Sequence, residues 1–134
     1  MSENGYRLLN LARVATLATI NPDGTPNLVP VVFALDGDRL VTAVDQKPKR
    51  SKNLARLQNI GRDQRVAVLA HHYAEDWARL WWVRADGTAS VVTSDPEAIS
   101  ALKSRYPQYA GDVDLSPVIS IAIETMRVWT ADQG

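Results

Sequence analysis

The residues best suited to chemistry form a basic cluster in the segment 45–54, which reads Asp-Gln-Lys-Pro-Lys-Arg-Ser-Lys-Asn-Leu. It holds Lys47, Lys49, Arg50 and Lys52, and it follows a predicted strand at the start of a predicted helix. Free N–H groups at a helix start bind anions, and a guanidinium adds bidentate recognition of phosphate. Ser51 is placed to cap that helix and to offer its hydroxyl. The segment predicts a site for one phosphoryl group, with a solvated basic loop as the competing interpretation.

A second group of residues is aromatic. Trp77, Trp81 and Trp82 lie within the stretch 76–84. Neighbouring residues of a strand point to opposite faces, so Trp81 and Trp82 cannot both fill one core. We expect one of them to face a partner subunit or a planar ligand, unless all three serve the core or an interface.

Other catalytic chemistry finds little support in the residue pattern. A metal site could be sought in the group His71, His72, Glu75 and Asp76. The two adjacent histidines diverge in a strand, and no third ligand follows at a recognisable spacing, so no metal is expected. The absence of cysteine excludes disulfides, thiolate zinc sites and cysteine nucleophiles. No nucleophile elbow, dinucleotide-binding or P-loop motif occurs.

The size and charge of the chain limit its class. Its 134 residues fit a single domain, 1–134, and 46% hydrophobic with 22% charged residues is ordinary for a globular protein. Fifteen basic and fifteen acidic side chains cancel, which argues against a nucleic-acid partner. The polar start and the lack of an apolar run of about 20 residues predict a cytoplasmic protein without a membrane partner.

The predicted elements are short and mostly β. Pro30 lies inside the second predicted strand and argues for an edge or a bulge there, because proline donates no ladder hydrogen bond. Six or more antiparallel strands cover their edges best by closing into a barrel with short flanking helices. We predict helices at 3–12, 51–60 (closed by Gly61) and 94–105, strands at 13–20, 27–35, 39–44, 64–71, 77–84, 89–93 and 117–130, and a turn or bulge at 85–88.

The pattern resembles a known family, the pyridoxamine-phosphate-oxidase-like, flavin-binding split β-barrels. The resemblance rests on the stretches 13–19, 23–31, 47–54, 64–68 and 76–88, in the order that the family has them. It is closest to the actinobacterial branch that uses a deazaflavin, coenzyme F420. The extended basic run, which suits the acidic tail of that cofactor, favours F420 over FMN.

The resemblance implies a homodimer with two cofactor sites at its interface, acting as an oxidoreductase on an unsaturated small-molecule substrate. It assigns backbone contacts with the cofactor ring to Pro30, Val31 and Val32, with Thr42 beside the ring. It assigns the phosphate to Arg50, helped by Lys49, Ser51 and Lys52. Trp77, Arg79 and Trp82 would border the substrate side or reach across the dimer. No catalytic residue is identified; Tyr73, His72 and Arg79 are each able to supply a proton.

Two other function classes compete with this one. A non-catalytic carrier could hold a flavin, haem or tetrapyrrole in the same barrel. An oligonucleotide-binding barrel would use the aromatic residues for stacking and the basic edge for phosphates, although the neutral overall charge speaks against it.

Overall fold

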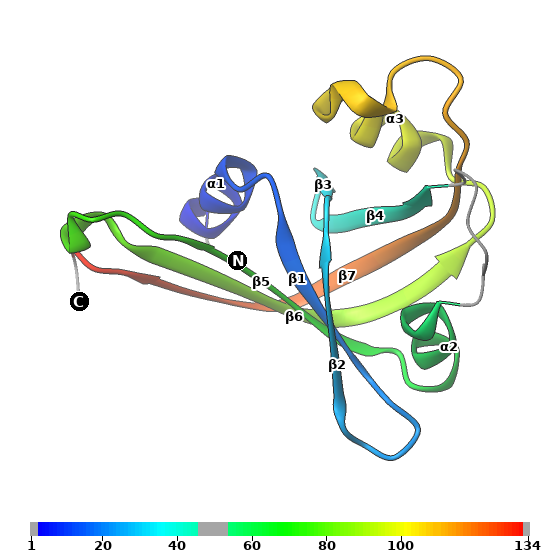
Figure 1. Ribbon diagram of the computed structural model, residues 1–134, viewed down its shortest axis with the longest axis horizontal. Coiled ribbons are helices and arrows are strands. Elements are labelled where there is room, and N and C mark those ends of the chain that lie inside the picture. The colour runs from blue at the N-terminus through cyan, green and yellow to red at the C-terminus, as the bar shows by residue number, and fades with distance from the viewer. Residues whose placement is uncertain (1–2, 46–53, 133–134) are drawn as a thin grey trace.

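The computed structural model describes residues 3–45 and 54–132 of the chain, apart from the side chain of residue 45. Seven antiparallel strands form one sheet in the order β2-β1-β5-β6-β7-β4-β3, with short helices around it (Figure 1). The elements are α1 (Glu3–Leu11), β1 (Ala15–Ile20), β2 (Pro26–Val31), β3 (Ala34–Asp36), β4 (Arg39–Asp45), α2 (Ala55–Arg62), β5 (Arg65–His72), the 3-10 turn η1 (Trp77–Arg79), β6 (Trp81–Val92), α3 (Pro96–Arg105), the 3-10 turn η2 (Pro107–Tyr109) and β7 (Leu115–Thr130).

The two end strands of this sheet are consecutive in the chain. β2 pairs only with β1 and β3 only with β4, yet Val32 and Phe33 alone separate them. The sheet therefore curls until its two edges are bridged by one bend of the chain rather than by ladder hydrogen bonds. This architecture confirms the predicted mainly β, split-barrel fold.

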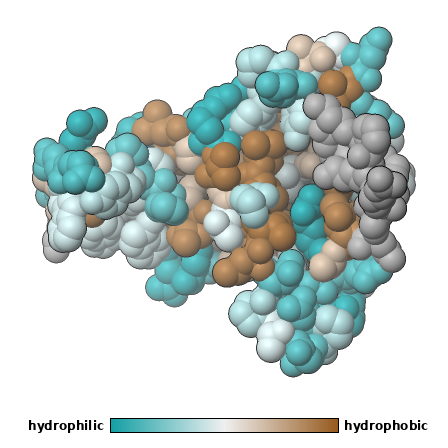
Figure 2. Space-filling view, in the orientation of Figure 1, coloured by the Kyte–Doolittle hydropathy of each residue, from teal (hydrophilic) through white to brown (hydrophobic). Residues whose placement is uncertain are grey.

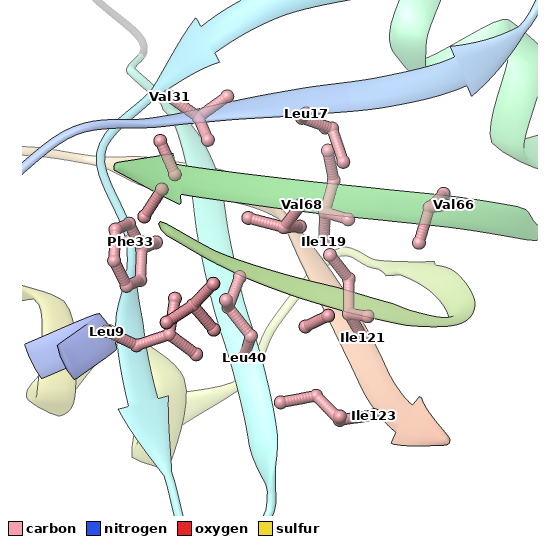
Figure 3. Packing of buried hydrophobic residues seen from close by; sticks show 14 of the residues in the cluster. Leu9, Leu17, Val31, Phe33, Leu40, Val66, Val68, Ile119, Ile121 and Ile123 are labelled. Atoms are coloured by element: carbon pink, nitrogen blue, oxygen red, sulfur yellow. The ribbon is translucent and has the colours of Figure 1, made fainter. Parts of the chain in front are cut away.

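Alternating side chains build the interior of the barrel. In β1, Ala15, Leu17 and Thr19 are buried and the residues between them are half-buried. Leu40, Val68 and Ile121 from three other strands are also fully buried, and they meet Phe33 of the bend between β2 and β3 in the same core (Figure 3). Burying a side chain of this size stabilises the fold by roughly 1.5–3 kcal/mol.

A second apolar cluster attaches α3 to the outside of the barrel. Ala98, Leu102 and Tyr106 pack on Val41 and Val118 of β4 and β7. Asp95 caps the helix by accepting a hydrogen bond from the amide of Ala98, and Pro96 occupies the first turn. The cluster places the C-terminal end of α3 beside the bend between β2 and β3.

The predicted strand 27–35 is wrong in one respect, because the chain changes pairing partner within it. Residues up to Val31 pair with β1, whereas Ala34–Asp36 pair with β4. The expected edge position of Pro30 is confirmed, since β2 is an end strand of the sheet. Alternation in the sequence marks buried faces and does not reveal which neighbour a strand adopts.

Three further boundaries differ from prediction. Trp77–Arg79 form a 3-10 turn rather than strand, because Asp76 accepts a hydrogen bond from the amide of Ala78 and starts a turn. The predicted strands 77–84 and 89–93 are joined in one strand, β6, which runs without a break through 85–88. Of the two alternatives predicted for 85–88, the bulge is confirmed by the register shift against β7 at Asp86 and Gly87. α2 extends past Gly61 to Arg62.

Within the described residues, no helix has both the length and the apolar character needed to cross a membrane.

Candidate cofactor site

A cavity of about 170 Å³ lies against the bend between β2 and β3, and we call it the bend pocket. Four residues singled out in the sequence as ring contacts, Pro30, Val31, Val32 and Thr42, line it together. The remaining lining residues, Ala43, Arg56 and Tyr109, were not anticipated. The structure thus brings the predicted ring contacts to one place and adds a cation to them.

The backbone at the pocket is held in place on one side and unpaired on the other. Pro30 and Val31 pair with β1, and no strand of the described part lies beyond β2. The Thr42 hydroxyl donates a 2.7 Å hydrogen bond to the carbonyl oxygen of Val32, which ties the bend to β4. A flat ligand can approach such an edge and use backbone groups for orientation.

Arg56 supplies the positive charge of the bend pocket. Burial lowers the pKa of its guanidinium, while the electrostatic interaction with Tyr109 raises it by less. No side chain in the described part of the chain, which leaves out that of residue 45, forms a hydrogen bond or ion pair with Arg56. A half-buried guanidinium without a carboxylate is costly in free energy, and a bound anion would offset that cost.

Helix α2 holds Arg56 in a fixed position. Asn59, which is 2% exposed, donates hydrogen bonds of 3.0 Å to Thr19 Oγ1 and to Asn21 Oδ1. Its side-chain oxygen Oδ1 accepts a 2.9 Å hydrogen bond from the guanidinium of Arg62. These contacts fasten α2 to the end of β1, so Arg56 sits on a helix whose orientation is determined by a satisfied buried amide.

The predicted phosphate ligands Lys49, Arg50, Ser51 and Lys52 lie outside the described residues, as does Lys47. Helix α2 begins at Ala55 with Leu54 at its N-cap position, and the side chain of Leu54 makes no capping hydrogen bond. The prediction that Ser51 caps this helix concerns a residue outside the described part of the chain and stays a prediction. In the sequence, β4 ends at Asp45, soon after Ala43, and α2 begins at Ala55, just before Arg56. Ala43 and Arg56 both line the bend pocket.

The other predicted ligand residues lie apart from the bend pocket. Trp77 is 67% exposed on η1, with its indole nitrogen 3.4 Å from the hydroxyl of Tyr73. Arg79 lines a different cavity, of about 200 Å³, near α1. Trp82 lines a third, of about 420 Å³, with Leu69, His71 and Arg84 on the outer face of β5 and β6. We call the last one the outer-face pocket.

The expectation that Trp81 and Trp82 face opposite sides is confirmed. Trp81 packs against the barrel core and stacks on His72, with ring centroids 5.8 Å apart. Trp82 pairs with His71 on one side and Trp129 on the other. Among the described residues, no three His, Asp or Glu side chains are grouped to hold a metal ion.

Sequence reasoning missed Arg56 because it searched for phosphate ligands inside the charged run. The available signal was weak: an arginine in the first turn of the helix that follows the run. Tyr109 comes from a turn more than fifty residues away in the sequence, and only the packing of α3 on β4 brings it near. No local pattern predicts such a long-range contact.

A family model described as pyridoxamine 5'-phosphate oxidase matches residues 2–130 of the chain. No curated protein sequence matches it.

Solved structures with this fold include the conserved hypothetical protein Rv2991 from Mycobacterium tuberculosis, with a TM-score of 0.73 and 24% identity over 98% of this chain and 86% of that one. A heme binding protein from Mycobacterium smegmatis has a TM-score of 0.70 and 20% identity, with 97% of this chain and 57% of that chain covered. The heme storage protein HutZ from Vibrio cholerae has a TM-score of 0.68 and 14% identity, with 96% and 93% covered. These identities support a common fold and no more.

Proposed function

We propose a function from one premise: this chain belongs to the pyridoxamine 5'-phosphate oxidase family, whose model matches residues 2–130. The protein binds a flavin-type cofactor in the bend pocket and is an oxidoreductase. The cofactor is the deazaflavin coenzyme F420, and the substrate is an unsaturated small molecule. FMN is the alternative cofactor on the same site.

The observation that carries this proposal is the half-buried guanidinium of Arg56 beside the unpaired edge at Pro30–Val32. A flavin-type cofactor combines a flat ring with a negatively charged phosphate. The ring needs an edge of fixed backbone groups, and the charge needs a cation that is not already paired. The bend pocket offers both within one small cavity.

The preference for F420 comes from the basic segment, which follows β4 and precedes α2 in the sequence. Ala43 of β4 and Arg56 of α2 both line the bend pocket. The four cations of the segment exceed what one phosphate needs, and the deazaflavin carries an additional acidic tail. This part of the proposal rests on the sequence, because residues 46–53 lie outside the described part of the chain.

The bound cofactor supplies the hydride, and the chain positions it and excludes water. Pro30, Val31 and Val32 orient the ring through the backbone, and Thr42 keeps that backbone in place through its hydrogen bond to Val32. Arg56 binds the negative charge of the cofactor. None of these groups is a general acid, so the proton comes from the substrate side or from water.

The test is a titration of the purified protein with F420 and with FMN, followed by fluorescence. We expect micromolar or tighter binding of F420, weaker binding of FMN, and loss of F420 binding in Arg50→Glu. Arg127→Gln, which removes an exposed cation of β7, is the control and should bind normally. Tight binding of FMN alone would move the protein to the flavin branch, and binding of neither would overturn the proposal.

The proposed assembly is a homodimer. Leu28, 63% exposed, and Leu69, 39% exposed, lie on the same outer face of β2-β1-β5, since their partners in β1 are Ala18 and Thr16. Figure 2 shows an apolar patch in the middle of the molecule, over β1 and β2. Pro30 belongs to this face and also lines the bend pocket. A second copy on this face would therefore border the cofactor.

The dimer is tested by sedimentation of the wild type and of Leu28→Glu. We expect a dimer that dissociates in Leu28→Glu and binds cofactor less tightly. Val91→Glu places the same charge on another exposed apolar residue, 40% exposed on β6, and should remain dimeric. A monomeric wild type would contradict the assembly without affecting the cofactor proposal.

A second candidate function is haem binding, because two of the structural neighbours are a heme binding protein and a heme storage protein. The candidate site for haem in this chain is the outer-face pocket. This pocket of about 420 Å³ offers an imidazole from His71, an indole from Trp82 and a guanidinium from Arg84. The imidazole suits the role of an iron ligand, the indole suits contact with the planar ring of haem, and the guanidinium suits a haem carboxylate. Hemin titration should then give a Soret shift that His71→Ala abolishes and His72→Ala retains; equal spectra for both variants would exclude this site.

A further inference from the structure

We propose that the cavity of about 200 Å³ between α1 and η1 binds a small organic carboxylate, in which a carboxylate group is joined to an apolar body. We call it the α1–η1 pocket. Arg7 of α1, Arg79 of η1, Leu80, Trp81 of β6, Thr130 of β7 and Asp132 are among its lining residues. It shares no lining residue with the bend pocket, so the inference does not depend on the proposed redox function.

The first observation is an unsatisfied hydroxyl. Thr130 Oγ1 is the one buried side-chain oxygen or nitrogen of the described residues that has no hydrogen-bond partner. Buried polar atoms are nearly always paired, and each exception requires a reason. Because Thr130 lines the pocket, a ligand oxygen is a suitable partner for its hydroxyl. A hydroxyl donates to a carboxylate as readily as it does to water.

The second observation is uncompensated positive charge. Arg79 forms no hydrogen bond or ion pair with any described residue, and the recorded hydrogen bond of Arg7 is with the side-chain oxygen of Asn4, at 2.7 Å. Asp132 is the acidic residue of the same rim and is not paired with either arginine among the described residues. Two guanidinium groups against one carboxylate leave a single positive charge. That balance favours a monoanion, and guanidinium groups recognise carboxylates bidentately.

The third observation is the apolar part of the lining. Leu8, which is 3% exposed, contributes to it together with Leu80 and the indole of Trp81. Inorganic ions gain nothing from such a surface, whereas an aromatic or aliphatic body buries apolar area against it. The pocket lies at the α1 end of the molecule, while α2 and α3 lie at the other end in Figure 1. The ligand class is therefore a carboxylate with a small apolar body, held away from the cofactor.

The experiment is an NMR titration of the uniformly ¹⁵N-labelled protein with three probes. Benzoate carries both features, benzyl alcohol carries the ring alone, and inorganic phosphate carries the charge alone. We expect saturable shifts of the Trp81 indole and the Thr130 amide with millimolar benzoate, and no shifts of the Val31 and Val32 amides. Benzyl alcohol and phosphate should bind at least about tenfold more weakly, as expected when one charge-assisted contact or the apolar contact is missing.

Two variants make the assignment specific. Arg79→Gln should weaken benzoate at least about tenfold, whereas Arg127→Gln should leave it unchanged. Thr130→Val removes an unsatisfied hydroxyl, so it should fold at least as stably as the wild type and still bind benzoate less tightly. Absence of saturation with benzoate, or equal affinity in Arg79→Gln, would overturn the proposal. Equally tight phosphate binding would overturn the claim that the ligand is organic.

Discussion

The hydroxyl of Tyr106 lies 2.7 Å from the carbonyl oxygen of Phe33 and 3.1 Å from its amide nitrogen. One side chain at the C-cap of α3 therefore satisfies both backbone groups of a residue at the bend between β2 and β3. Phe33 is fully buried and has no strand partner there. Because the same bend presents Pro30–Val32 to the bend pocket, the residue that ends α3 helps to hold the candidate site in place.

Tyr106→Phe should lower the free energy of unfolding by about 1–3 kcal/mol, because it leaves buried backbone groups of Phe33 without a partner. Equilibrium unfolding in urea measures this loss. Tyr73→Phe is the matched control: Tyr73 is 60% exposed, so its variant should stay within about 0.5 kcal/mol of the wild type. A similarly small effect of Tyr106→Phe would show that water forms hydrogen bonds with the backbone groups of Phe33 in place of the tyrosine hydroxyl.

Arg56→Gln should weaken cofactor binding about tenfold or more, because a charge-assisted hydrogen bond contributes roughly 1.5–3 kcal/mol. The same change should not lower the free energy of unfolding, because the guanidinium that is removed forms no hydrogen bond or ion pair with a described side chain. Binding and urea unfolding of one preparation give both quantities. Destabilisation with unchanged affinity would make Arg56 a structural residue and remove the support it gives to the proposed function.

The sequence predicts the fold well because its signals are local. Alternating buried residues mark β1 and β5, and Asp95 with Pro96 marks the start of α3. It fails where the outcome depends on long-range pairing. The stretch around Val32 and Phe33 looks like continuous strand, and only the closure of the sheet divides it between two partners. Trp77–Arg79 likewise have strand-like composition, and the cap from Asp76 turns them.

For the candidate site too, the sequence predicts what depends on local signals and misses what depends on long-range packing. Pro30, Val31 and Val32 are neighbours in the sequence, and the resemblance placed Thr42 with them; all four line one pocket. Arg56 and Tyr109 could not be assigned, since their approach depends on how α2 and η2 pack on the barrel. The resemblance grouped Arg79 and Trp82 on the substrate side, yet Arg79 lies in the η1 turn and Trp82 on the outer face of β6, so they line separate cavities.

The loss of stability at acid pH should depend on Asp95. Hydrogen bonds from Arg39, at 2.7 and 3.1 Å, followed by the amide of Ala98, keep the pKa of this carboxyl below its ordinary value. The pKa of Asp95 is thus lower in the folded state than in the unfolded state. The ionised carboxylate therefore makes its full contribution to stability above about pH 4, and this contribution is lost as the pH falls through the folded-state pKa. Asp95→Asn should be less stable at pH 7 by about 1–3 kcal/mol and should lose less stability between pH 5 and pH 3.

Thermal unfolding across that pH range tests the Asp95 prediction. Asp112→Asn, at an exposed carboxyl, should follow the wild-type curve. Some acid dependence will remain in Asp95→Asn, since Arg65 lowers the pKa of Asp63 to about 2 and Thr25 lowers that of Asp23. Parallel curves for Asp95→Asn and the wild type would show that the ion pair with Arg39 contributes no net stability.

Two glycines should respond in opposite directions to the same substitution. At Gly87, in the bulge between β6 and β7, a Cβ atom would overlap the backbone carbonyl oxygen of Ala122, so Gly87→Ala must shift one strand. We expect the free energy of unfolding to fall by about 1–3 kcal/mol, as for other overpacked interiors.

At Gly61, within α2, a Cβ atom would meet open space, and alanine has the better helix propensity. Gly61→Ala should therefore stabilise the protein by roughly 0.5–1 kcal/mol. Urea unfolding of both variants gives the two signs, and a neutral Gly87→Ala would mean that β6 and β7 approach each other less closely than their pairing register requires.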